Sequence, residues 1–149
     1  MTDISIRPLA ATDRGEWNTL YAGYAEFYGV KQTQDMRDRV WGWLLDPAHS
    51  TEGLVATGPD GTIVGLAHYR PFARPLAAGI GGFLDDLFVI PTARGSGAAD
   101  ALIDQIKVIA TQRGWGLVRW ITADDNYRGR GLYDKMATRT GWITYDIKL

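Results

Sequence analysis

Hydrophobic and polar residues follow two distinct periods in the first third of the chain. Apolar and polar positions alternate over residues 4–9, which is the period of a half-buried strand. Apolar side chains then recur every three or four residues, which predicts a helix from an N-cap at Asp13 to a glycine stop at Gly29. The same period predicts a second helix from Thr33 to about Leu45.

The middle of the chain has the pattern of strands and turns. Two hydrophobic runs, residues 54–57 and 62–69, flank Gly58-Pro59-Asp60-Gly61, whose proline and glycines set turn dihedrals. This arrangement predicts an antiparallel hairpin. Residues 71–82 are rich in glycine and contain prolines, so we expect a loop whose tip is a candidate mobile lid. A third apolar strand is predicted over residues 83–90.

The helical period returns over residues 97–113, and this is the clearest helix in the sequence. Residues 117–122 are typical of a buried strand, and a last helix opens at Asp125 or Asn126. Residues 142–149 alternate as a terminal strand. The order β-α-α-β-β-β-α-β-α-β predicts one α/β domain, spanning residues 1–149, in which helices cover a mixed sheet.

Composition narrows the classes of function. The chain has 149 residues, of which 46% are hydrophobic and 22% charged, as in ordinary globular domains. A net charge of −1 lacks the basic excess of a nucleic-acid binder, so we expect no nucleic-acid partner. The absence of cysteine excludes thiolate catalysis and disulfides. No apolar run is long enough to span a membrane, so we expect a cytoplasmic protein with no membrane partner.

The segment with the most chemical information is residues 87–100, where a strand passes through a proline, an arginine and a tight glycine turn into a helix. A helix start has unpaired amide hydrogens and a positive dipole end, and Gly95 and Gly97 let a phosphate approach the backbone. No glycine precedes a lysine, which excludes a P-loop, and Asp100 replaces the third glycine of a dinucleotide fingerprint. A plain strand-to-helix turn would explain the glycines but not Arg94 just before them.

Residues 94–99 resemble the R/Q-x-x-G-x-G/A signature of the GNAT-type N-acetyltransferases, which binds the pyrophosphate of acetyl-CoA. Residues 85–89 and 126–133 also match, with spacings similar to the polyamine acetyltransferase and HPA2-like branches. The resemblance covers essentially the whole chain. It implies a mixed, mostly antiparallel sheet of six to seven strands flanked by four helices. Only one predicted strand follows the last helix, although the family sheet commonly has two.

The resemblance also implies which residues contact acetyl-CoA, the expected co-substrate. One group is the strand whose backbone pairs with the pantetheine arm. A second is the loop whose amides bind the pyrophosphate, and Asn126 is the residue that touches the cofactor arm. The strand residues are Leu87, Phe88 and Val89, and the loop residues are Arg94, Gly95, Ser96, Gly97, Ala98 and Ala99.

For catalysis, the resemblance places Tyr133 near the thioester sulfur as the proton donor to the leaving thiolate. Asp85 matches the acidic base position, with a proton relayed through water. By strand alternation its neighbour Asp86 should point to the other face of the sheet, unless a bulge brings both to the cleft. An amide near Phe88 is the expected oxyanion donor. The competing interpretations are a core aromatic for Tyr133 and a local ion pair for Asp85.

The sequence is less informative about the residues that bind the acetyl acceptor than about those that bind acetyl-CoA. Tyr24 and Tyr28 belong to an aromatic helical stripe that packs on the sheet or partly lines a pocket. With Trp41 and Asp86 they are our candidate substrate-binding residues. His49 and His68 are isolated, so we expect no metal site.

We expect acetyl transfer to a primary amine of a polyamine-like or amino-acid-like small molecule, in a ternary complex. A protein-lysine acceptor and a non-catalytic acyl-CoA-binding module are the alternatives. We also expect a homodimer, because the terminal strand either ends the sheet short or pairs with a second subunit.

Overall fold

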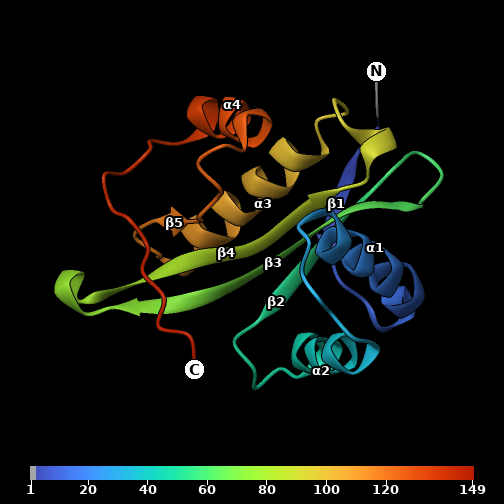
Figure 1. The fold of residues 1–149 in the computed structure, drawn as a ribbon, viewed down its shortest axis with the longest axis horizontal. Coiled ribbons are helices and arrows are strands. Elements are labelled where there is room, and N and C mark those ends of the chain that lie inside the picture. The colour runs from blue at the N-terminus through green and yellow to red at the C-terminus, as the bar shows by residue number, and fades with distance from the viewer. Residues whose placement is uncertain (1–2) are drawn as a thin grey trace.

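The computed structural model describes residues 3–149 of the chain (Figure 1). Its helices and strands largely follow the hydrophobic pattern. The strands are β1 (Ser5–Pro8), β2 (Glu52–Thr57), β3 (Ile63–Arg74), β4 (Gly79–Val89) and β5 (Val118–Arg119). The helices are α1 (Arg14–Phe27), α2 (Gln34–Leu45), α3 (Ala98–Arg113) and α4 (Tyr127–Met136).

Local capping fixes the helix boundaries that the sequence predicts. Thr33 caps α2, since its hydroxyl accepts a hydrogen bond from the Met36 amide at 3.2 Å. Gly29 follows α1 with φ +66°, a conformation that glycine adopts without steric cost. Asp13 plays a different part from the one expected: its carboxylate accepts from the Ala10 amide at 2.7 Å and pairs with Arg7, and so caps the short turn before α1.

Within the described residues the sheet has five strands in the order β1-β2-β3-β4-β5. β1 to β4 are antiparallel neighbours, and β5 runs parallel to β4. α1 and α2 lie on one face, and α3 and α4 on the other (Figure 1). This is the mixed, mostly antiparallel α/β sheet with four helices that was expected.

Each face of the sheet has its own core. Leu102 and Ile106 of α3 pack against Leu54 and Leu84 of the sheet. On the opposite face the core is aromatic, and it comprises Trp17, Tyr21, Trp41, Leu66 and Phe88. Burial of each such side chain contributes about 1.5–3 kcal/mol, so both helical layers are held to the sheet mainly by apolar contacts.

The expected loop over residues 71–82 is wrong, whereas the mobility of its tip stays a prediction. Residues 71–74 continue β3 and residues 79–82 begin β4, so this segment is the end of a long hairpin that projects from the sheet (Figure 1). Phe72 and Phe83 pack edge to face across it, with centroids 5.9 Å apart. A Cβ on Gly81 would lie 2.8 Å from the Phe72 ring. The glycines therefore make room for cross-strand aromatic packing instead of marking a loop.

The expected terminal strand over residues 142–149 and the sheet of six to seven strands are also wrong. In the structure this segment has no regular secondary structure, and β5 is only two residues long. An alternating pattern forms a strand only beside a partner that satisfies its backbone. Within residues 3–149 no segment lies against the outer edge of β5. The tail apolar side chains are therefore exposed: Trp142, Ile143, Tyr145, Ile147 and Leu149.

Candidate active site

The candidate site begins where β4 and β5 separate. These strands pair only at Gly82 with Val118 and at Phe83 with Arg119. From Leu84 to Val89, β4 stays paired with β3 on one side. On its other side no strand of the described chain adjoins it. Backbone N–H and C=O groups along this edge are thus available to an extended ligand, which would bind as an added strand. Leu87, Phe88 and Val89, the predicted pantetheine-binding residues, lie on this stretch.

At its end, β4 leads directly into the start of α3 through a glycine turn. Gly95 and Gly97 have φ +81° and +87°, and nothing lies within 4 Å of the Cβ that either would carry. Their requirement for glycine therefore comes from the backbone conformation alone. Gly97 is the N-cap of α3.

Some backbone amides of this turn donate hydrogen bonds within the protein, and others have no acceptor there. Arg94 and Ser96 donate to Pro91 and Ala93 carbonyls, and Ala98 donates to the Ser96 hydroxyl. No acceptor within residues 3–149 pairs with a second set of amides, those of Gly95, Gly97, Ala99 and Asp100. Free donors at a helix start, combined with the helix dipole, form an anion-binding site. The Arg94 guanidinium lies over the Phe27 ring at 5.2 Å, beside this turn.

α4 follows β5 along the chain. Asn126 is its N-cap: the side-chain oxygen accepts from the Gly129 amide at 3.2 Å, and its NH2 group donates to Thr122 at 2.9 Å. A Cβ on Gly129 would lie 2.6 Å from the Asn126 amide nitrogen. Gly129 therefore allows the cap to close. The predicted role of Asn126 on the cofactor arm stays a prediction beside this capping role.

Tyr133 lies on α4, half-buried, with its ring 5.4 Å from Trp120. Within the described chain its hydroxyl has no hydrogen-bond partner. Burial raises the pKa of Tyr133, and the neighbouring Tyr28 raises it further. The phenol is therefore protonated at neutral pH, as a proton donor must be. Tyr28 itself is half exposed at the end of α1, and it lies near enough to Tyr133 to affect its pKa.

Asp85 and Asp86 lie on the same face of the sheet because β4 contains a bulge. Asp86 pairs with His68 and Leu84 with Tyr69, so Asp85 has no partner on β3. β4 therefore contains the bulge that the alternative required. Asp85 pairs with Arg70 and Asp86 with His68, and these two β3 residues lie on the same face of that strand because they are two positions apart. That both carboxylates reach the acceptor stays a prediction.

The two carboxylates have different partners. Asp85 forms an ion pair with Arg70 at 2.9 Å near the surface. Burial raises the pKa of Asp85, and Arg70 opposes that shift. Asp86 accepts from the Tyr21 hydroxyl at 3.0 Å and lies 2.8 Å from His68 Nδ1. Burial alone would raise the pKa of Asp86, but the interactions with His68, Tyr21 and Tyr24, of which that with His68 is the largest, bring it below its ordinary value.

Tyrosines connect Asp86 to the region of Tyr133. The Tyr24 ring lies 4.8 Å from Tyr28 and 5.6 Å from Phe88. Burial raises the pKa of Tyr24, with a further contribution from the charge of Asp86. The structure therefore brings together Tyr24, Tyr28 and Asp86, three of the four predicted substrate-binding residues.

Trp41, the fourth, lies elsewhere. It is 5% exposed and packs against Trp17 at 5.0 Å in the aromatic core. Little of its surface is available to an amine.

Sequence reasoning assigned no site role to His68, Tyr21 or Trp17. A usable signal existed, because His68 sits within a strongly apolar strand, and a buried polar side chain requires a partner. The adjacent predicted strand offers two consecutive aspartates. The missing information was the register between β3 and β4, which places His68 opposite Asp86.

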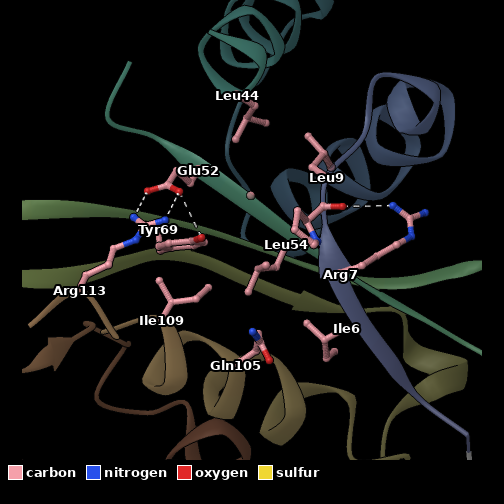
Figure 2. Close-up of a pocket in the computed structure, with 12 residues that line it drawn as sticks. Ile6, Arg7, Leu9, Leu44, Glu52, Leu54, Tyr69, Gln105, Ile109 and Arg113 are labelled. Carbon is pink, nitrogen blue, oxygen red and sulfur yellow. Dashed lines mark hydrogen bonds and ion pairs between the residues drawn. The ribbon is translucent and has the colours of Figure 1, made fainter. Parts of the chain in front are cut away.

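A separate hollow of about 350 Å³ lies at the other edge of the sheet, among α2, α3, β1 and β2 (Figure 2). Its charged side chains are already paired: Arg113 binds Glu52 at 2.6 Å, and Arg7 binds Asp13 at 2.7 Å. Tyr69 points to the same Glu52 (Figure 2). Burial raises the pKa of Tyr69 to about 12. This hollow is remote from the separated strands and offers no unpaired charge to a ligand.

The fold and the site define a protein that can hold a long, phosphate-bearing ligand along β4, with titratable groups on either side of it. Residues 17–137 match the acetyltransferase (GNAT) family. The chain belongs to this family, and is an acetyl-CoA-dependent N-acetyltransferase. No helix within residues 3–149 has the length and apolar character needed to cross a bilayer.

Three comparisons illustrate the relationship. The chain is 26% identical to D-amino-acid N-acetyltransferase HPA3 of Saccharomyces cerevisiae over 95% of this chain and 89% of that protein. It is 29% identical to aminoglycoside N(6')-acetyltransferase type 1 of Klebsiella aerogenes over 73% and 72%. A crystal structure of ribosomal-protein-alanine N-acetyltransferase from Brucella melitensis biovar Abortus 2308 superimposes with a TM-score of 0.82 and 27% identity, over 99% of both chains.

Proposed function

We propose that this protein transfers the acetyl group of acetyl-CoA to the primary amine of a small, cationic molecule, polyamine-like or amino-acid-like, by direct attack in a ternary complex. The observation that carries the proposal is the continuity of two features: a strand edge without a partner leads straight into four free amides at the start of α3. The edge suits the amides of a pantetheine arm, and the helix start suits a pyrophosphate.

The acceptor class is inferred from charge and from the relatives. Asp85 and Asp86 share one face, with Tyr24 and Tyr28 beside them. An acidic, aromatic surface attracts an ammonium group even though the net charge of the whole chain is near zero. Two similar proteins are named for D-amino acids and aminoglycosides, which are small amines.

The proposed reaction needs only a few groups for proton transfer and oxyanion stabilisation. The amine first loses a proton to the acidic pair on β4, directly or through water. Its lone pair then attacks the thioester carbonyl, and an amide near Phe88 hydrogen-bonds the developing oxyanion. When the C–S bond breaks, Tyr133 gives its proton to the thiolate. The attacking nitrogen still carries an extra proton after C–N bond formation, and this proton returns to the phenolate. The acidic pair releases to solvent the proton that it took from the ammonium group, so the enzyme returns to its starting state.

We also propose a homodimer. The tail alternates Ile143, Tyr145, Ile147 and Leu149 with polar residues, and all of these apolar side chains are exposed. Among residues 3–149, no strand lies beside the outer edge of β5. A strand pattern without a partner and an edge without a strand complement each other between two copies.

A free-thiol release assay tests the proposal. Purified protein is mixed with acetyl-CoA and, in turn, with polyamines, D- and L-amino acids, aminoglycosides, lysine peptides and a peptide with N-terminal alanine. Acetyl-CoA-dependent thiol release with a small amine supports the proposal. Turnover with the peptides alone would assign the protein-acetylating alternative. Tight CoA binding without turnover on any acceptor would assign the non-catalytic module.

A further inference from the structure

A continuous chain of hydrogen bonds runs from the aromatic core to the acidic pair. Trp17 Nε1 lies 2.9 Å from His68 Nε2, and His68 Nδ1 lies 2.8 Å from Asp86 Oδ2. Trp17 is 1% exposed and His68 2% exposed, whereas Asp86 is 19% exposed. This series of hydrogen bonds therefore begins at fully buried side chains and ends at a carboxylate that solvent reaches.

The chemistry of the indole fixes the tautomer of His68. An indole N–H can only donate, so His68 Nε2 must be the acceptor and carry no proton. The proton of the neutral ring then sits on Nδ1 and is donated to Asp86. Protonation of Nε2 would set two N–H groups against each other in a buried site. The contact with Trp17 therefore keeps the imidazole neutral.

A neutral His68 leaves Asp86 as a charge without an ion-pair partner, unlike Asp85, which pairs with Arg70. The hydrogen bonds to Asp86 from His68, at 2.8 Å, and from Tyr21, at 3.0 Å, both go to Oδ2. The Tyr24 hydroxyl is a further neighbour of the carboxylate, and neither His68 nor Tyr21 occupies Oδ1. No buried side-chain oxygen of the described chain lacks a partner, so Oδ1 is open to solvent. The arrangement holds one oxygen in place and presents the other.

We propose that His68, oriented by Trp17, is a positioning residue that keeps Asp86 ionised, with its free oxygen directed to the acceptor amine. This inference rests on the proposed function and deepens it, because it makes Asp86 the carboxylate that binds the ammonium group and takes its proton. The charged and titratable groups facing Asp86 are Tyr21 and Tyr24 of α1, His68 and Arg70 of β3, and Asp85 of β4.

The most direct test is ¹⁵N and ¹³C NMR of the intact protein. We expect the neutral ring of His68 to show the tautomer with the proton on Nδ1. We expect the carboxyl pKa of Asp86 to rise in His68→Leu and to stay near the wild-type value in His68→Asn, whose amide retains a donor. A proton on Nε2, or an Asp86 pKa that His68→Leu leaves unchanged, would overturn the proposal.

Kinetics supply the second readout. In His68→Leu we expect the acid limb of kcat/KM for the amine to move up by about one pH unit. Asp86 stays ionised at neutral pH, so a fall of about 10-fold in kcat/KM there would come from the lost orientation of its carboxylate and not from its protonation. CoA affinity should be unchanged, and His68→Asn should restore most of the activity. Should His68→Leu only lower Tm, with the pH profile of wild type, His68 is merely a core residue. If wild type itself turns over no amine, the proposed function fails, and the NMR titration still decides the role of His68.

Discussion

Two adjacent aspartates show how much a single residue's surroundings decide. Asp85 and Asp86 have the same side chain and lie on the same face, yet the pKa of Asp85 is raised and that of Asp86 is lowered. Asp85 is stabilised by one surface arginine, whereas Asp86 receives two hydrogen bonds from buried groups. Neighbouring carboxyls whose pKa values are pushed apart suit different roles in a proton-transfer site.

Tyr133 offers a test at the same scale. Tyr133→Phe should lower kcat about 10-fold or more and leave CoA affinity almost unchanged, because only the thiolate-side proton donor is lost. The matched control is Tyr127→Phe, which changes an exposed tyrosine of the same helix and should retain wild-type kinetics. Steady-state thiol release and calorimetry with CoA supply the two numbers. Equal kcat values for the two variants would remove Tyr133 from the mechanism.

The Arg7–Asp13 pair makes stability depend on pH. Asp13 is buried, and the hydrogen bond from Arg7 is the largest cause that lowers its pKa. A carboxyl with a lowered pKa in the folded state stabilises the fold above its unfolded pKa, about 3.9, and that stabilisation is lost as the pH falls further.

Asp13→Asn should therefore lower the free energy of unfolding by about 1.5–3 kcal/mol at pH 7. The difference from wild type should shrink as the pH falls below about 4. Denaturant unfolding at both pH values measures this, with Asp104→Asn on the solvent side of α3 as the control. A difference that is independent of pH would contradict the assignment.

At the scale of elements, the sequence predicted best what depends on neighbours along the chain. The glycine turn into α3, the Thr33 cap and the end of α1 all follow from local backbone and capping preferences. The sequence alone did not decide whether β4 has a bulge at Asp85, because the bulge depends on how β3 and β4 align. The loop predicted over residues 71–82 was wrong for the same reason: glycines that relieve cross-strand crowding have the composition of a loop.

The glycine turn can be tested without creating a clash. Gly97→Ala places its Cβ in open space, but at φ +87° it should cost about 1–2 kcal/mol in backbone strain. We expect the turn to shift and CoA affinity to fall about 10-fold. Gly42→Ala, at an exposed position inside α2, is the control, since it should raise stability slightly and leave CoA binding intact. Calorimetry that finds wild-type affinity in Gly97→Ala would contradict the role of the turn.

At the scale of the whole molecule, the unpaired tail is the main departure from the sequence-based fold. The alternation over residues 142–149 has the period of a strand, but a strand also needs a hydrogen-bonding edge within reach. A single sequence shows the alternation of a strand, but it does not show whether a neighbouring strand is available to pair with it. The fold class, the four helices and the glycine turn into α3 were therefore predictable, whereas the strand count was not.

Assembly is tested by charging the tail. If two copies exchange this segment, wild type should sediment as a dimer, and the double variant Tyr145→Asp/Ile147→Asp should sediment as a monomer. Val108→Asp, at another exposed apolar position, should stay dimeric. A wild-type protein that remains monomeric across the concentration range would contradict the proposed dimer and leave the site on each chain as described.

The central claim is that the free backbone amides at the start of α3 bind the pyrophosphate of acetyl-CoA. Amide NMR of the labelled protein during titration with CoA tests it most directly, with pantetheine, which lacks the pyrophosphate, as the matched ligand. We predict large shifts at Gly95, Gly97, Ala99 and Asp100 with CoA and small ones with pantetheine, while the residues of β4 respond to both. If CoA binds and these four amides stay unperturbed, or if CoA does not bind at all, the account is contradicted.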